Sequence, residues 1–271
     1  MTYLDLTLLS TNYDSNGFIS PVDIIPAADA ARHRQRMEDV EEKFGPVHYK
    51  TKIHTVLTSP FELATNKTVL DVVESLIGPN ILLHNVTYII KEPNSQSHVS
   101  WHQDLTYWGF SDDAQVSMWL ALSTANAKSG CMRMVPGSHK TGMHDHEITD
   151  DDTNVLYSGQ SVHNVDETAA VMCELQPGQA SFHHGWTLHA SMPNHSDDRR
   201  IGLNVQYFAP HMKQLKSDQD SAMLARGNDQ YGHFDVDIAA KTDLEPAAIK
   251  TQAALERRYI ENSAAKEVQR L

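Results

Sequence analysis

Residues 100–108 read Ser-Trp-His-Gln-Asp-Leu-Thr-Tyr-Trp, and this stretch decides how the whole chain is interpreted. It contains a His-x-Asp motif, His102 and Asp104. We expect an extended strand over Val99–Asp104, in which side chains alternate between faces, so both would point the same way. An imidazole and a carboxylate presented together are two thirds of a 2-His-1-carboxylate triad, the arrangement that binds Fe(II). The chain has 16 histidines, so this pair alone is weak evidence.

A second histidine and an arginine follow downstream. Arg200 lies eleven residues beyond His189. His183 and His184 compete with His189 as the third ligand, but no arginine lies eleven residues beyond His184. His189 is therefore favoured, and one of the other two could still face the pocket.

The segment Arg200–Phe208 alternates in polarity. Arg200, Gly202, Asn204 and Gln206 fall on one face, and Ile201, Leu203, Val205 and Tyr207 fall on the other. This pattern is typical of a strand with one polar and one apolar face. A polar face inside a barrel costs free energy unless it binds something. The planar guanidinium of Arg200 suits a carboxylate bound bidentately.

Four motifs, in this order, carry a family resemblance: Trp101-His102-Gln103-Asp104, Met118-Trp119-Leu120-Ala121-Leu122, Gly130-Cys131-Met132-Arg133-Met134-Val135-Pro136-Gly137-Ser138-His139, and Leu188-His189-Ala190-Ser191 with Arg200. With them the chain resembles the phytanoyl-CoA dioxygenase family of Fe(II)/2-oxoglutarate oxygenases over roughly residues 80 to 210. The resemblance implies a mostly β fold with flanking helices and a double-stranded β-helix (jelly-roll, cupin-like) core.

The resemblance also implies roles for individual residues. His102, Asp104 and His189 would bind Fe(II), with 2-oxoglutarate and O2 as co-substrates. Arg200 would bind the distal carboxylate of 2-oxoglutarate, and Ser191 would support it. Relatives that halogenate have a small residue in place of the carboxylate, so Asp104 favours hydroxylation.

Two further residues enter by similarity to the ectoine hydroxylase branch of the family. Asn85 and Trp119 would line the co-substrate site. Asn85 stands where that branch usually has glutamine, and core packing is the alternative for Trp119.

Four residues are candidates for the substrate pocket. Tyr107 and Trp108 directly follow the metal motif and would wall the pocket, where their rings would suit an ammonium group; core packing is the alternative. Arg133 is expected on a strand, and a buried arginine needs an anionic partner, either a substrate anion or a structural ion pair. His184 is the fourth candidate.

Three stretches, Leu83–Lys91, Trp101–Phe110 and Ser181–Trp186, are similar to the bacterial branch that hydroxylates aminoethylphosphonates at the carbon next to phosphorus. The similarity implies 2-aminoethylphosphonate or its N-trimethyl form as the small-molecule substrate. An ectoine- or amino-acid-like metabolite is the alternative within the class. Two alternatives belong to other classes. One is a non-catalytic jelly-roll metal-binding protein. The other is a cupin-type isomerase or hydrolase, and such an enzyme would not need Arg200.

Composition limits the partners. The chain has 271 residues, enough for one domain with a substantial core, and a formal net charge of -13. This charge argues against nucleic acid and against an anionic membrane surface as partners. Cys131 and Cys173 form no disulfide framework, and no apolar run could span a bilayer, so we expect a cytoplasmic protein. The oligomeric state is open between monomer and homodimer.

We expect a single oxygenase domain, residues 1–271, with a helical N-terminal part at about 20–80, the jelly-roll core at about 81–210 and a C-terminal helical tail at about 240–271. Residues 1–25 are a polar leading segment. Helices are expected over Ala27–Phe44, from Ser59 as N-cap with Pro60 as the first helical residue, and from about Lys67 to Gly78.

Strands are expected over Ile81–Lys91, Val99–Asp104, Val116–Leu122, Cys131–Val135, Gln179–His183 and Ile201–Phe208. The polar segment 138–171 is predicted to be a solvated, lid-like loop. A metal cluster of His139, His144 and His146 is the less favoured interpretation of this segment, because these histidines have no regular spacing.

Overall fold

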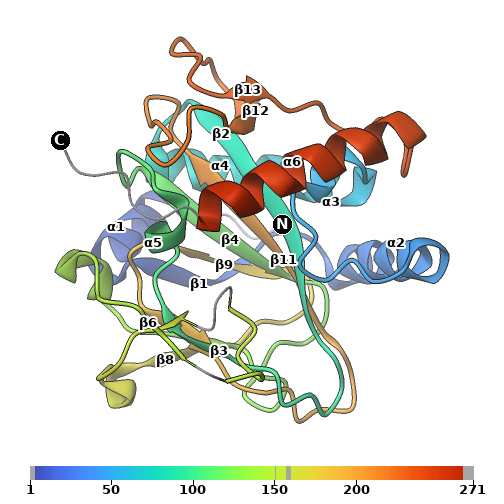
Figure 1. Cartoon of the computed structure of the whole chain (residues 1–271). Coiled ribbons are helices and arrows are strands. Elements are labelled where there is room, and N and C mark those ends of the chain that lie inside the picture. The colour runs from blue at the N-terminus through green and yellow to red at the C-terminus, as the bar shows by residue number, and fades with distance from the viewer. Residues whose placement is uncertain (1–3, 150, 157–159, 265–271) are drawn as a thin grey trace.

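A computed structural model of the chain describes residues 4–149, 151–156 and 160–264. Two β-sheets form its centre (Figure 1). The larger has the strand order β1-β9-β4-β11-β2-β12-β13, the smaller has the order β3-β10-β5-β8, and β6 pairs with β7 separately. Their bounds are β1 Phe18–Asp23, β2 Ile81–Lys91, β3 Val99–His102, β4 Gln115–Ala121, β5 Met132–Met134, β6 Glu147–Ile148, β7 Gln160–Ser161, β8 Val171–Cys173, β9 Gln179–His183, β10 His189–Ser191, β11 Arg200–Phe208, β12 Ser221–Arg226 and β13 Asp235–Val236.

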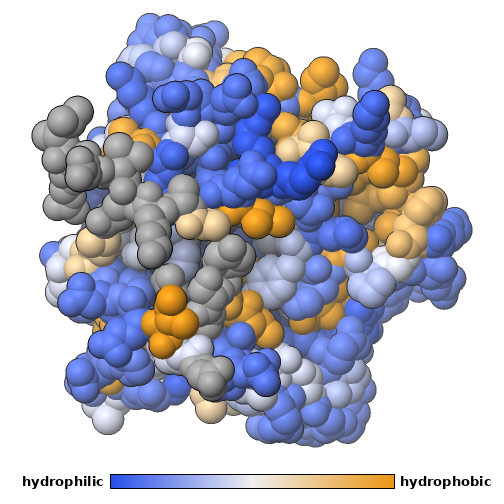
Figure 2. Space-filling view, viewed as in Figure 1, coloured by the Kyte–Doolittle hydropathy of each residue, from blue (hydrophilic) through white to orange (hydrophobic). Residues whose placement is uncertain are grey.

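Helices flank the sheets. Their bounds are α1 Leu6–Asn16, α2 Ala27–Phe44, α3 Thr58–Ala64, α4 Lys67–Ile77, α5 Leu105–Trp108 and α6 Pro246–Ala264, with short 3-10 turns at Ile53–Thr55, Ser138–Thr141 and Glu167–Ala169. In Figure 1, α6 crosses in front of β11 and β2, and α3 and α4 lie behind them. The face crossed by α6 is mostly hydrophilic (Figure 2). None of the helices in the described residues has the length and apolar character that crossing a membrane requires.

The main hydrophobic core lies between the larger sheet and the helices that precede it. The apolar face of β11 packs there with Met37 of α2, Leu63 of α3 and Val73 of α4. Each such side chain contributes about 1.5–3 kcal/mol when it is fully buried. The predicted alternation of Arg200–Phe208 is confirmed, because Ile201, Leu203, Val205 and Tyr207 all join this core.

The opposite face of the larger sheet faces the smaller sheet and carries both polar side chains and a second apolar cluster, which includes Trp119 of β4 and Met134 of β5. The register of β2 against β11 shifts between Gln206 and Tyr207, which pair with Asn85 and Leu83. This bulge inserts one extra residue, His84, into β2. It lets Leu83 join the outer core while Asn85 lies on the inner face.

The fold class predicted from the sequence is confirmed, with strands at the centre and helices around them, although the two sheets do not join into a closed barrel. The bounds of β2, β9 and α2 agree with the predicted ones. The polar leading segment was wrongly assigned, because it holds α1 and β1. Asp5 caps α1 by accepting a hydrogen bond from Leu8 N at 3.0 Å, and β1 pairs with the distant β9.

The predicted N-cap of α3 is also wrong. The helix begins at Thr58, one residue before Ser59, and its N-cap Leu57 offers no side-chain hydrogen bond. Asp243 does the capping from a distant part of the chain, since its Oδ1 accepts from both Thr58 N and Thr58 Oγ1 at 2.6 Å. The Ser59 hydroxyl instead lies 2.7 Å from His33 Nδ1.

A substitution at Gly202 would test how tightly the inner face of the larger sheet is packed. A Cβ at this position would collide with the buried ring of Trp119 on β4. We expect Gly202→Ala to lower the free energy of unfolding by about 1–3 kcal/mol through overpacking, measured by urea denaturation. Leu224→Ala on the exposed side of β12 is the control and should change it by less than about 0.5 kcal/mol. Equal stability of the Gly202→Ala and parent proteins would contradict this packing.

Candidate active site

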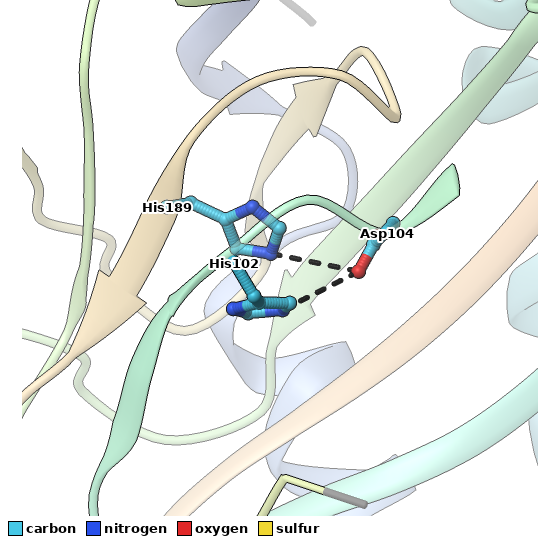
Figure 3. A group of neighbouring side chains, drawn as sticks. All are labelled: His102, Asp104 and His189. Atoms are coloured by element: carbon cyan, nitrogen blue, oxygen red, sulfur yellow. Dashed lines mark ion pairs between the residues drawn. The ribbon is translucent and has the colours of Figure 1, made fainter. Parts of the chain in front are cut away.

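Three ligand atoms meet where the two sheets face one another. His102 is the last residue of β3, His189 is the first residue of β10, and the two are antiparallel partners. Ligand atoms of His102, Asp104 and His189 all lie within 4.8 Å of one another. Figure 3 shows both imidazole rings directed at the carboxylate of Asp104. The sequence prediction of which residues converge therefore agrees with this geometry.

The strand predicted to run through Asp104 ends earlier, at His102. Asp104 has φ -61 and ψ -44, the right-handed helical conformation, and directly precedes α5. A turn, and not strand alternation, therefore brings its carboxylate back toward the two histidines. The carboxylate and the two imidazoles do converge, but the extended conformation predicted for Asp104 is wrong.

Hydrogen bonds fix the orientation of both imidazole rings. His102 Nδ1 lies 2.9 Å from Ser100 O, and His189 Nδ1 lies 2.9 Å from Thr187 O. A ring nitrogen beside a carbonyl oxygen must carry the proton, so Nε2 of each ring presents its lone pair to the shared centre. Burial, with His102 nearby, lowers the pKa of His189 well below its ordinary value, which favours the neutral form that binds metal.

The carboxylate of Asp104 is held in the same way. Its Oδ2 accepts from Ser117 Oγ at 2.9 Å and from His183 Nε2 at 3.2 Å. Its Oδ1 lies 3.4 Å from His102 Nε2 and 3.7 Å from His189 Nε2. Burial raises the pKa of Asp104, but the histidines lower it by more, and it ends well below its ordinary value. Two neutral imidazoles and one ionised oxygen fit Fe(II).

The triad opens into a cavity of about 360 Å³. Tyr107 and Trp108 of α5 line it, as the sequence predicted for substrate residues, and so do Asn85, Trp119 and Ser191. Asn85 Oδ1 accepts a hydrogen bond from Lys52 N at 2.8 Å, which fixes the orientation of its amide.

Arg200 lies in the wall of the same cavity with only 1% of its surface exposed. Its Nη1 donates to Gly130 O at 2.6 Å, and its guanidinium carbon lies 5.0 Å from the Trp119 ring centre. Nε has no hydrogen-bond partner, and Arg200 forms no ion pair with the acids of the described residues. Burial lowers its pKa to about 10. A buried cation without an acid partner marks a site for an anion.

Two predicted substrate residues lie elsewhere. Arg133 donates from Nη1 to Glu167 Oε2 at 2.8 Å and stacks on Trp101 at 4.9 Å, so the structural ion pair is the correct alternative. Its neighbour Met132 lines the cavity, and alternation along β5 therefore turns Arg133 away. His184 accepts a hydrogen bond from Trp186 N outside the cavity lining, and His183 is the histidine that faces the cavity.

Parts of the cavity wall come from residues that the sequence analysis did not name as site residues. Tyr259 of α6 lines it, with its hydroxyl 3.2 Å from Gln206 Nε2 on β11. Gln206 could have been identified from the sequence, because it belongs to the predicted polar face of the strand. Nothing in the local sequence of α6 indicates that Tyr259 is a pocket residue. Val155 and Leu156 of the segment 138–171 also line the cavity, and Val155 N donates to His98 O at 3.0 Å.

The triad is the only set of three potential ligands close enough to share an ion among the residues that the structure describes. His139, His144 and His146 do not form such a cluster. His146 Nε2 instead accepts from Gln103 N at 3.1 Å, next to the metal motif.

Comparison with known proteins agrees with this geometry. The chain is 33% identical over 151 residues to a probable alpha-ketoglutarate-dependent hypophosphite dioxygenase of Stutzerimonas stutzeri, covering 54% of this chain and 52% of that protein. It therefore spans about half the length of that relative. It is 27% identical over 226 residues to a probable phytanoyl-CoA dioxygenase of Caenorhabditis elegans, covering 72% of each.

Solved structures share the fold. The non-heme monooxygenase ThoJ, in its apo form, matches with a TM-score of 0.82 and 28% identity, covering 94% of this chain and 98% of that one. CytC3 with Fe(II) and alpha-ketoglutarate matches with a TM-score of 0.66 and 20% identity, covering 90% of this chain and 96% of that one.

The family predicted from the motifs is confirmed by a direct match. The model of the family described as phytanoyl-CoA dioxygenase (PhyH) matches residues 13–202, which include the triad and Arg200. This chain belongs to the phytanoyl-CoA dioxygenase (PhyH) family.

Proposed function

We propose that this chain is an Fe(II)- and 2-oxoglutarate-dependent oxygenase that hydroxylates an aliphatic C–H bond of a small polar metabolite. The best candidate is C1 of 2-aminoethylphosphonate or of its N-trimethyl form. One observation carries the proposal. A His-Asp-His triad with its lone pairs directed at one centre shares a cavity with a buried arginine that has no acid partner among the described residues. Family membership supports the same class of enzyme.

In this proposal the triad binds the metal and neighbouring side chains hold the triad in place. Nε2 of His102, Nε2 of His189 and Oδ1 of Asp104 would hold Fe(II) from one side and leave the cavity side open. The bound Fe(II), 2-oxoglutarate and O2 would supply the oxidising power, with 2-oxoglutarate converted to succinate and CO2 as the substrate C–H becomes C–OH. Ser117 and His183 hold Oδ2 of Asp104, so that Oδ1 stays directed at the two histidines and would be free to bind the metal.

Arg200 would bind the distal carboxylate of 2-oxoglutarate. A guanidinium offers a rigid fork of donors that matches a carboxylate. Trp119 packs against Arg200 and restricts where it can move. Ser191, which also lines the cavity, would add a hydroxyl hydrogen bond to the same carboxylate.

The substrate must be small, because it shares about 360 Å³ with 2-oxoglutarate. Tyr107, Trp108 and Tyr259 offer aromatic rings for a primary or trimethylated ammonium. Arg133 is not available for a phosphonate, so the donor would be a neutral group that lines the cavity, such as the Gln206 amide, while Asn85 and Trp119 would line the co-substrate site. The Stutzerimonas relative, by its name, oxidises a phosphorus compound. An ectoine- or amino-acid-like metabolite is the alternative substrate.

We also propose that the enzyme acts in the cytoplasm, where thiols stay reduced. Cys131 and Cys173 are both free and buried, which is compatible with a reducing compartment.

The metal ligands can be tested singly. We expect His102→Ala, Asp104→Ala and His189→Ala each to lower Fe(II) binding and succinate formation by more than about 100-fold, because loss of a direct ligand should exceed the effect of losing a supporting residue. Fe(II) retention by the purified protein and succinate release would be measured together. His184→Ala, outside the cavity lining, is the matched control. Turnover retained in any one of the three variants would remove that residue from the triad.

Arg200→Ala tests the co-substrate site. We expect it to raise the KM for 2-oxoglutarate about 10- to 150-fold, since a hydrogen bond to a charged group contributes about 1.5–3 kcal/mol. Steady-state succinate assays at saturating substrate would measure the effect. Arg133→Ala, which removes a guanidinium outside the cavity, should leave this KM unchanged. An unaltered KM in Arg200→Ala would show that the distal carboxylate binds elsewhere.

The substrate can be tested by spectroscopy. Bidentate 2-oxoglutarate on Fe(II) should give a weak visible charge-transfer band under anaerobic conditions. We expect 2-aminoethylphosphonate or its trimethyl form to shift this band, and ectoine to leave it unshifted. A band that only ectoine or an amino acid shifts would favour the alternative substrate. The absence of any band with 2-oxoglutarate would refute the proposed enzyme class.

A further inference from the structure

A second basic side chain lies buried beside Arg200. Lys91 ends β2 and is the direct antiparallel partner of Arg200 on β11, so both side chains project from the same face of the sheet. Lys91 is only 2% exposed and does not line the cavity. It therefore lies behind the wall that Arg200 and Ser191 form.

All the hydrogen-bond acceptors of the Lys91 ammonium are neutral. Nζ donates to Ser191 Oγ at 2.8 Å, to Ser191 O at 3.2 Å and to Met192 O. Like Arg200, it forms no ion pair with the acids of the described residues. Charging both of these neighbouring buried basic groups without an acid partner is costly, and an anion bound beside Arg200 and Ser191 would offset that cost.

The hydrogen bond from Lys91 to Ser191 restricts the direction in which the Ser191 hydroxyl can donate. A hydroxyl has one hydrogen to donate and two lone pairs that accept. In its charged form Lys91 has three N–H donors for its three acceptors, so it occupies a lone pair of Ser191 Oγ and leaves the hydroxyl hydrogen to donate elsewhere. Ser191 lines the cavity, so that hydrogen can point to an acceptor bound beside Arg200.

We propose that Lys91 is a positioning residue for 2-oxoglutarate, which orients the Ser191 hydroxyl toward the distal carboxylate and takes up a proton when the dianion binds. This inference rests on the proposed function, since it takes 2-oxoglutarate as the anion.

The charged and titratable groups around Lys91 determine whether it gains or loses a proton when the anion binds. Arg200 faces it from β11, and the Cys131 thiol faces it from the segment before β5. Burial raises the pKa of Cys131 to about 11, so this thiol stays neutral. Burial first, and then the charge of Arg200, lowers the pKa of Lys91 to about 6. Lys91 is therefore largely neutral at pH 7.5 in the free protein, and a nearby carboxylate would raise its pKa again.

The affinity for 2-oxoglutarate should therefore fall as the pH rises above about 6. Below about pH 6, Lys91 is charged before and after binding, and the affinity is constant. Above pH 6, binding requires proton uptake, so the Kd rises until the pH passes the pKa of the bound state. The total rise is about tenfold for each unit by which 2-oxoglutarate raises the pKa.

Calorimetry can measure this proton directly. We would titrate 2-oxoglutarate into anaerobic Fe(II)-loaded protein at pH 7.5 in buffers of different ionisation enthalpy, and measure the Kd between pH 6 and 8.5. We expect the parent protein to take up most of one proton. Lys91→Met should take up none from this site, bind more weakly at pH 6 and lose the rise in Kd. The control Lys67→Met, on the surface of α4, should behave like the parent.

A second variant separates charge from folding. Lys91→Arg keeps a cation that cannot deprotonate, so it should bind 2-oxoglutarate with a Kd that is constant across this range and without proton uptake. Its result decides the matter even if Lys91→Met does not fold. Proton uptake that is absent in the parent, or unchanged in either Lys91 variant, would overturn the role of Lys91 alone. No binding of 2-oxoglutarate to the parent would overturn the proposed function as well.

Discussion

The antiparallel pairing of β3 with β10 places His102 opposite His189, and the rest of the site depends on this register. Side chains alternate along a strand, so a slip of one residue would turn one imidazole to the other face of the sheet. The carbonyl groups of Ser100 and Thr187 then fix both rings. Because the two histidines lie at the end of one strand and the start of another, the turn that follows β3 can bring the Asp104 carboxylate to the same point.

The larger sheet separates two kinds of surface. Its outer face is apolar and is covered by helices, whereas its inner face carries amides, hydroxyls and cations. Amides and hydroxyls on such a face can hydrogen-bond to one another, as Gln206 and Tyr259 do. The basic side chains of Arg200 and Lys91 have only neutral partners among the described residues. Their cost in stability is understandable if the inner face is a binding surface for an anion.

The distribution of acids explains which arginines are paired and which is left without an acid partner among the described residues. Glu167 reaches Arg133, and Glu92 and Glu41 reach Arg199, so these guanidinium groups belong to structural ion pairs. Asp104 is the acid of the cavity, and Ser117 and His183 hold it on one side. An arginine adjacent in sequence to a paired one can thus be unpaired, as Arg200 is beside Arg199.

The sequence by itself determined the course of β2 and β11 and the inward direction of Arg200, because polarity with a period of two is a local property. The motifs that carry the family resemblance indicated the fold class and the three residues, His102, Asp104 and His189, that converge in the structure. Only the tertiary structure decided that a turn delivers Asp104, that His183 and not His184 faces the cavity, and that Glu167 neutralises Arg133. It also decided that Tyr259 lines the cavity and that Lys91 lies beside Arg200. Each of these depends on strand register or on contacts between residues far apart in the chain, which the local sequence does not encode.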